Sequence, residues 1–156
     1  LPSYPLRRMR TRAHRNGFTL IELLLVIGII AILASIVIVA INPTKQLGDA
    51  RNAQRRSDVN TILNAVYQYS IDTRGQLPAG IDTDPKGICL TGAASCENGV
   101  DLSVLTLTGT YLVSIPQDPS STSATGASYN IVRDTSGRVT VTAPLAEQGA
   151  TISVTR

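Results

Sequence analysis

A single carboxylate, Glu22, lies inside an apolar run that extends from Phe18 to Ile41 and contains no other charge. A charged group near the centre of a lipid bilayer costs roughly 2.5 to 3.5 kcal/mol, and less toward the bilayer edge. A chain that keeps such a group in such a run is expected to provide a partner for it.

A local explanation for Glu22 also exists. Thr19 and Glu22 fit the capping box, in which a hydroxyl and a carboxylate satisfy the free backbone N–H groups at the start of a helix. Gln also serves in that motif, so a capping role would not require the charge. Both explanations stay open at this point.

The element that must position Glu22 is a membrane span. A helix over residues 18–41 would be roughly 36 Å long, which exceeds the roughly 30 Å of a hydrocarbon core. Leu23 to Ala34 contains no polar side chain, whereas a core helix of a soluble protein has a polar outer face. The run is too long for a secretory signal peptide and continues through Asn42-Pro43 into a polar helical pattern, so we expect it to be retained.

The charges are divided unequally about this span. Five arginines and no acid precede Phe18, whereas nine basic and all eleven acidic side chains follow it. The positive-inside bias places the first residues in the cytoplasm and the remainder outside. Because the part after the leader is slightly acidic, the basic pI does not indicate a nucleic-acid partner.

The junction Arg15-Asn16-Gly17-Phe18-Thr19-Leu20-Ile21-Glu22 resembles the processing site of type IV prepilins, a motif that type II secretion pseudopilins share. The resemblance implies that a prepilin peptidase in the inner membrane cuts between Gly17 and Phe18 and methylates the new amino group of Phe18. It also implies that residues 1–17 are a removed leader and that Glu22 serves assembly. Taken alone, Gly17 could be a helix breaker and Phe18 apolar bulk at the interface.

The segment 42–74 is predicted to continue the helix as an amphipathic half, after a bend or brief break at Asn42-Pro43. Arg51, Arg55, Arg56 and Asp58 fall largely off its apolar stripe. We expect them on a solvated face with weak pairing such as Arg55 with Asp58, with a subunit contact as the alternative. The stripe itself consists of Leu47, Ala50, Ala53, Val59, Ile62, Leu63, Val66 and Ser70.

Residues 75–156 are predicted to form a globular head. Residues 79–101 read as a surface loop in which Cys89 and Cys96, the only cysteines, form a disulfide outside the cytoplasm. Alternating β-branched residues predict three antiparallel strands, at Ser128–Asp134, Arg138–Ala143 and Thr151–Thr155, the first two joined in a hairpin by Gly137. The expected fold is α+β: a long N-terminal helix packed on a small antiparallel sheet, as in pilins.

No catalytic constellation is visible after the leader, where there is no histidine and no serine in a nucleophile-elbow setting, so the chain is not predicted to be an enzyme. No metal site and no cofactor is predicted. Calcium binding by Asp82, Asp84 and Asp118 is a minor alternative to solvated loop aspartates, because the further ligands of an EF-hand loop are missing. A four-ligand zinc site is not expected either, because His14 is the only histidine and Cys89 and Cys96 are the only cysteines.

These patterns predict a structural subunit of a type IV pilus-like filament, held in the inner membrane before assembly with its head outside the cytoplasm. Its expected partners are copies of itself through the N-terminal helices, the prepilin peptidase and an inner-membrane assembly platform. A pseudopilin of a periplasmic type II secretion pseudopilus is one alternative. An uncleaved, membrane-anchored binding or adhesive module is the alternative from another class.

Overall fold

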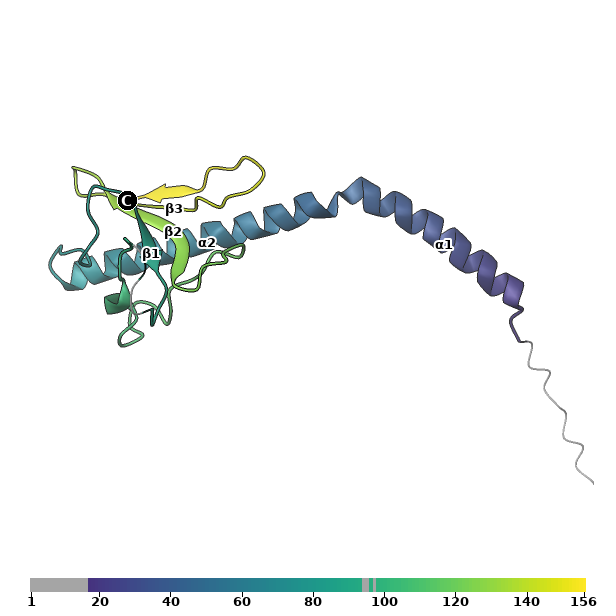
Figure 1. Ribbon diagram of the computed structural model, residues 1–156, viewed down its shortest axis with the longest axis horizontal. Helices are drawn as coiled ribbons and strands as arrows, with labels where there is room; N and C mark the ends of the chain where they lie inside the picture. The colour runs from purple at the N-terminus through teal and green to yellow at the C-terminus, as the bar shows by residue number, and fades with distance from the viewer. Residues whose placement is uncertain (1–16, 94–95, 97) are drawn as a thin grey trace, which may run out of the picture. The chain divides into compact units, whose positions relative to one another are not determined.

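The computed structural model describes residues 17–93, 96 and 98–156, which form two compact units that meet between Asn42 and Pro43 (Figure 1). The leader predicted for residues 1–17 therefore lies outside the described part, apart from Gly17. The second unit, Pro43–Arg156, is called the globular unit below. The described elements are α1 (Leu20–Ile41), α2 (Pro43–Asp72), β1 (Lys86–Cys89), the short 3-10 helix η1 (Ser103–Leu105), β2 (Gly126–Arg133), β3 (Val139–Thr142) and β4 (Ser153–Thr155).

Helix α1 has the length and apolar composition needed to cross a membrane. None of its residues is buried within the chain, so its whole apolar surface requires another environment. The hydroxyl of Ser35 donates to the carbonyl of Ile32 at 2.7 Å, which satisfies a polar group within the run. The helix ends at Ile41, because Asn42 takes a left-handed conformation with φ 43° and Pro43 follows, so the expected break is present.

Helix α2 buries its predicted apolar face only in its second half. Val59, Ile62, Leu63 and Val66 are all 0% exposed, as expected. The prediction for the first half was wrong, because Leu47, Ala50 and Ala53 are exposed. The residues buried there instead are Gly48, Asn52, Arg55 and Asp58. At 3.6 residues per turn, Ala50 and Ala53 lie on the side of α2 opposite Val59 and Ile62, whereas Asn52 and Arg55 lie on the covered side and contact polar loops.

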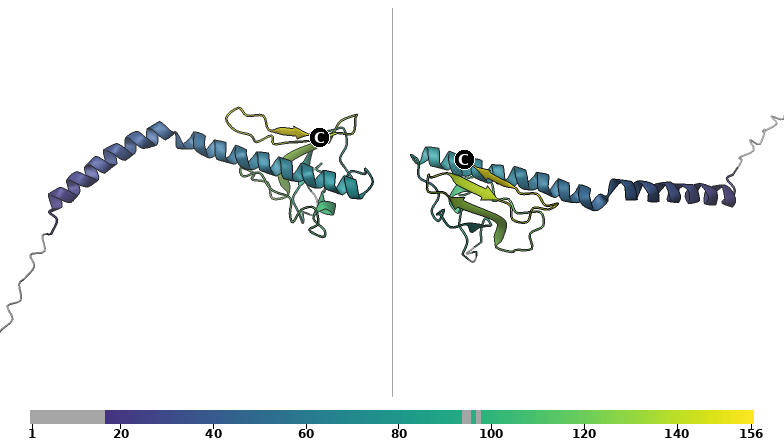
Figure 2. Two further views of the ribbon diagram at one scale, coloured as in Figure 1. Left: turned by 180° about the vertical axis from the view of Figure 1, so that it is seen from behind. Right: turned by 90° about the horizontal axis from the view of Figure 1, so that it is seen from above.

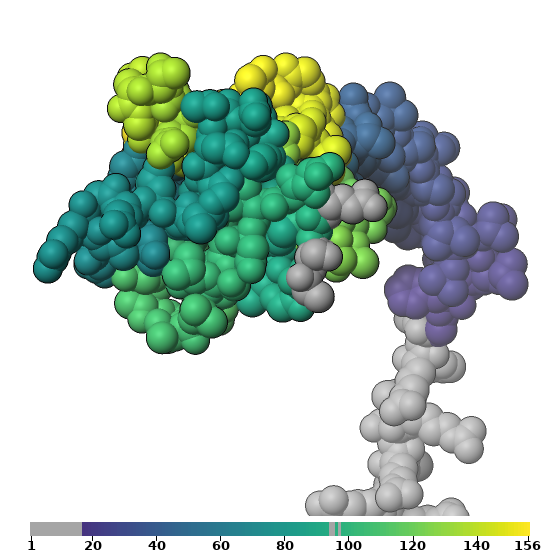
Figure 3. Space-filling view, turned by 60° about the vertical axis from the view of Figure 1, so that its left-hand side comes forward, coloured from purple at the N-terminus to yellow at the C-terminus, as the bar shows by residue number. Residues whose placement is uncertain are grey.

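The sheet has four antiparallel strands in the order β1-β2-β3-β4, not the three that were predicted. The missed strand, β1, lies inside the segment 79–101 that was expected to be a loop. Strand β1 is only four residues long and contains Gly87, so its sequence shows no alternation of apolar and polar residues. Its pairing with β2 also shifts register between Gly87 and Cys89. The β2–β3 hairpin is confirmed, with Gly137 at φ 89° in its turn, and the tip protrudes at the surface (Figure 3, yellow-green).

The core of the globular unit lies between the apolar face of α2 and the sheet, whose strands run beside that helix (Figure 2). Alternate residues of β2, namely Ala127, Tyr129 and Ile131, are buried, as are Val139 and Val141 of β3. This period of two is what the sequence predicted for a sheet with one face covered. A long helix on a small antiparallel sheet confirms the α+β fold.

Arg55 is fully buried, which contradicts the expected solvated face. Its Nε donates to Oδ2 of Asp118 at 2.7 Å and its Nη2 donates to Oδ1 at 3.1 Å, and neither side chain is exposed. Nη1 and Nη2 also donate to Asn52 and Ser120 at 2.9 and 2.7 Å. The hydrogen bonds to Asp118 are the main cause that raises the pKa of Arg55. Asp118 is therefore a core ion-pair partner rather than a solvated loop aspartate.

Asp58 is also buried and does not pair with Arg55. It accepts hydrogen bonds from the hydroxyl of Tyr129 and from Gln54, each at 2.7 Å. Burial, reinforced by the bond to Asp58, raises the pKa of the Tyr129 hydroxyl. Asp118, through Arg55, and Asp58, through Tyr129, thus tie α2 to a covering loop and to strand β2.

The loop between β3 and β4 is held on α2 by Glu147. The side-chain amide of Asn52 donates to the carbonyl of Glu147 at 2.8 Å and accepts from its N–H at 2.9 Å. The carboxylate of Glu147 forms an ion pair with Arg51 at 2.8 Å. Hydrogen bonding by Arg51 is the main cause that lowers the pKa of Glu147.

Candidate processing and assembly site

The bond between Gly17 and Phe18 lies in a non-helical segment, because α1 begins only at Leu20. Both residues are exposed, and Phe18 exposes 82% of its surface. A Cβ atom at Gly17 would have no heavy atom of a described residue within 4 Å, apart from those of its immediate chain neighbours. A peptidase needs an accessible backbone that is not locked in a helix, and Gly17 and Phe18 are both exposed and precede α1.

Glu22 takes part in the capping box that the sequence allowed. Thr19 is the N-cap of α1, and both its backbone N–H and its hydroxyl group donate to Oε2 of Glu22 at 2.8 Å. In return, the N–H of Glu22 donates to the Thr19 hydroxyl oxygen at 3.3 Å. Glu22 therefore has a local structural role in the isolated chain.

The cap engages only one of the two carboxylate oxygens. Oε1 of Glu22 accepts no hydrogen bond from the residues that the structure describes. A carboxylate oxygen accepts more strongly from a charged donor than from a neutral one. The arrangement therefore leaves an anionic acceptor, fixed in orientation by Thr19, open to a cation at the start of an apolar helix.

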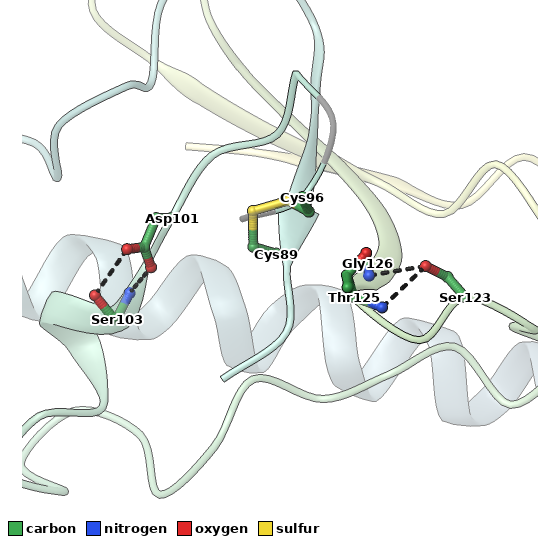
Figure 4. The surroundings of a disulfide bond; sticks show 7 residues. All are labelled: Cys89, Cys96, Asp101, Ser103, Ser123, Thr125 and Gly126. Carbon is green, nitrogen blue, oxygen red and sulfur yellow. Dashed lines mark hydrogen bonds between the residues drawn. A yellow bond between two sulfur atoms is a disulfide. The ribbon is translucent and has the colours of Figure 1, made fainter. Parts of the chain in front are cut away.

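Cys89 and Cys96 form the predicted disulfide (Figure 4). Their Cα atoms are 5.4 Å apart, which is within the usual range. Cys89 ends β1, and its N–H donates to the carbonyl of Val100 at 3.0 Å. Across from the disulfide, Ser123 accepts from the N–H of Gly126 at 2.8 Å. The disulfide thus staples a short loop onto the edge of the sheet.

The residues that the sequence analysis missed are those around Arg55. A pattern that could have revealed them exists: Asn52, Arg55, Val59, Ile62 and Val66 recur at steps of three and four residues, so Asn52 and Arg55 are in phase with the apolar face. Polar residues in phase with a buried stripe indicate polar partners in the covering loops.

The comparisons with known proteins agree with this geometry at the N-terminus. The sequence pattern of the family described as the prokaryotic N-terminal methylation motif matches residues 12–38. The chain therefore carries the N-terminal motif of pilins and pseudopilins, and the resemblance drawn from Gly17, Phe18 and Glu22 is confirmed.

One curated relative is the type II secretion system core protein G of Escherichia coli (strain K12), which is 38% identical over 64 residues. The match covers 41% of this chain and 43% of the relative, so the chain spans less than half the length of the curated relative it matches. No solved structure matches the chain.

Proposed function

We propose that this chain is the precursor of a structural subunit of a pilus-like filament. The observation that carries the proposal is the combination of an exposed Gly17-Phe18 junction with an apolar helix whose only charge, Glu22, keeps one oxygen open. A prepilin peptidase would cut after Gly17 and methylate Phe18. The chain would then stay in the inner membrane through α1 until an assembly platform adds it to the filament.

Between pilus and pseudopilus we favour the pseudopilus. The methylation motif is common to both machines, whereas the match over 64 residues is to a core protein of type II secretion. The filament would then lie in the periplasm, outside the inner membrane.

Cleavage gives Glu22 the partner that its environment requires. Removal of residues 1–17 creates an ammonium group on Phe18, and methylation preserves its positive charge. Phe18 precedes Glu22 by four residues, so every processed subunit would carry both charges near the start of α1. In a staggered bundle, the ammonium of one subunit would meet Oε1 of Glu22 in its neighbour. Low dielectric strengthens this attraction and penalises any subunit out of register.

Filament yield at matched membrane levels tests this role against capping alone. Glu22→Ala should be inserted and cleaved but fail to polymerise, and Glu22→Gln should do slightly better because it keeps some hydrogen bonding. Thr19→Val is the matched control, since it removes the capping hydroxyl and keeps the carboxylate. Capping alone predicts similar, modest losses for Thr19→Val and Glu22→Ala. Near-normal filaments from Glu22→Ala would refute the register role.

A further inference from the structure

A cavity of about 520 Å³ lies in the globular unit beside the C-terminal end of α2. Residues from the end of α2, from the segment that follows this helix and from the β2–β3 hairpin line it together. Pockets of roughly 300–1,000 Å³ have the size that takes small ligands in proteins. The lining includes Ser70, Gln76, Leu77, Pro78, Ile81 and Arg133, and none of the residues of the processing and assembly site belongs to it.

Arg133 is the only residue with a charged side chain among those that line the cavity. Its guanidinium group is exposed and forms no hydrogen bond or ion pair with a described residue. Two acids lie near it in the chain or in space, and each pairs with another cation. Asp82 pairs with Lys86 at 2.5 Å, and Asp134 pairs with Arg138 at 3.1 Å. The cavity therefore contains a cation without an acid of its own among the described residues.

The segment after α2 adds hydrogen-bond donors that the described chain does not use. The backbone N–H groups of Leu77 and of residues 79–81 donate to no described residue. The hydroxyl of Ser70 and the side-chain amide of Gln76 donate to none either. Gly80 takes a left-handed conformation with φ 89°, and successive N–H groups around such a turn form a nest that binds anions. Unused donors beside an unpaired cation favour an anionic ligand.

The chemistry of the lining indicates which anion fits. A single guanidinium group matches a single negative charge, and its planar fork can pair with both oxygens of a carboxylate. A phosphate monoester would bring a larger charge than one arginine balances. Leu77, Pro78 and Ile81 supply an apolar wall next to these polar groups. The fitting ligand is therefore a carboxylate that carries an apolar group.

We propose that this cavity binds a monocarboxylate with an apolar group, a chemistry shared by the free C-terminal end of a peptide and by small carboxylic acids. Arg133 pairs with the carboxylate, and the N–H groups of Leu77 and of residues 79–81 share its oxygens. Backbone nests capture peptide C-termini in this way in other proteins. The proposal goes beyond the filament role and does not rest on it, because the binding site belongs to a single chain.

Titration of the isotope-labelled full chain in detergent micelles, followed by NMR chemical shifts, tests the site. N-acetylated alanyl-alanyl-leucine with a free carboxylate should bind with a Kd of roughly 0.1–1 mM, and its C-terminal amide at least about tenfold more weakly. Arg133→Gln should weaken binding of the free acid at least about tenfold. Arg56→Gln is the matched control, since it removes an exposed arginine outside the cavity and should leave the Kd within about twofold. Equal binding of acid and amide, or an unchanged Kd in Arg133→Gln, would overturn the proposal.

Two further ligands distinguish the sources of the carboxylate. If the peptide binds more tightly than 4-methylpentanoate, the site takes peptide ends; if 4-methylpentanoate binds at least as tightly, the site takes small acids. Either result supports the carboxylate site, whereas tighter binding of inorganic phosphate than of both would overturn it.

Amide hydrogen exchange gives a second readout that a merely structural role of Arg133 would not change. Saturating acid should slow exchange at Leu77, Ala79 and Gly80 at least about threefold, because their N–H groups would then donate to the ligand. Unchanged exchange at all three, or no saturation by any of the acids up to about 10 mM, would contradict the proposed site. None of these results depends on whether the chain forms a filament.

Discussion

Replacing Arg55 with leucine is expected to destabilise the globular unit strongly. Among the described residues, the change leaves the buried carboxylate of Asp118 with only the N–H of Ser120, at 2.8 Å, as a remaining donor. Breaking a buried ion pair from one side costs about 3–5 kcal/mol. The stability of a unit of this size is typically about 5–15 kcal/mol, so the loss is a large fraction of the total. For about 110 residues it corresponds to a fall in Tm of roughly 10–25 °C.

Thermal unfolding of the full chain in detergent micelles, followed by circular dichroism, measures this effect. Lys45→Met is the control, because the pair Lys45–Asp49 is exposed (59% and 47% of the two side chains) and should contribute less than about 0.5 kcal/mol. The double variant Arg55→Leu/Asp118→Leu should regain most of the lost stability, since no charge then remains unpaired. If Arg55→Leu stays within about 0.5 kcal/mol of wild type, the reasoning about this buried pair is wrong.

Three further outcomes are expected. Replacing Cys89 or Cys96 with serine should loosen the stapled loop and leave α2 folded, and the chain-entropy model gives a loss of about 2–3 kcal/mol in the free energy of unfolding. Hydrogen exchange should then become faster only in residues 87–100. Because the pKa of Glu147 is lowered in the folded chain, its stabilising effect should be complete above about pH 4.3 and lost as the pH falls through the folded value. Glu147→Gln should therefore flatten the acid side of the stability profile, and an unchanged slope would contradict this. Gly137→Ala should destabilise the globular unit by about 1–3 kcal/mol in urea unfolding, since its φ of 89° strains any other residue.

Features governed by local sequence were predictable. The apolar run, the break at Asn42-Pro43, the hairpin around Gly137 and the disulfide each follow from residues adjacent or close in the chain. The apolar half of α2 was predictable as well, because Val59, Ile62, Leu63 and Val66 mark one side of a helix.

Features governed by residues far apart in the sequence were not predictable. Arg55 was expected in water because its partner, Asp118, is 63 residues away in a proline-flanked loop, and no spacing rule links the two. Strand β1 was missed because its place in the sheet comes from pairing with β2 and not from its own four residues. In both cases the tertiary contact decided the outcome over local propensity.

The mass of the N-terminal peptide of the membrane-held protein shows whether the chain is processed as a prepilin. We expect this peptide to begin at Phe18 and to carry one added methyl group on its amino nitrogen. We expect Gly17→Leu to keep its leader, because a bulky side chain does not fit a site shaped for glycine. A wild-type protein that retains residues 1–17, or a Gly17→Leu variant that is cleaved normally, would contradict it.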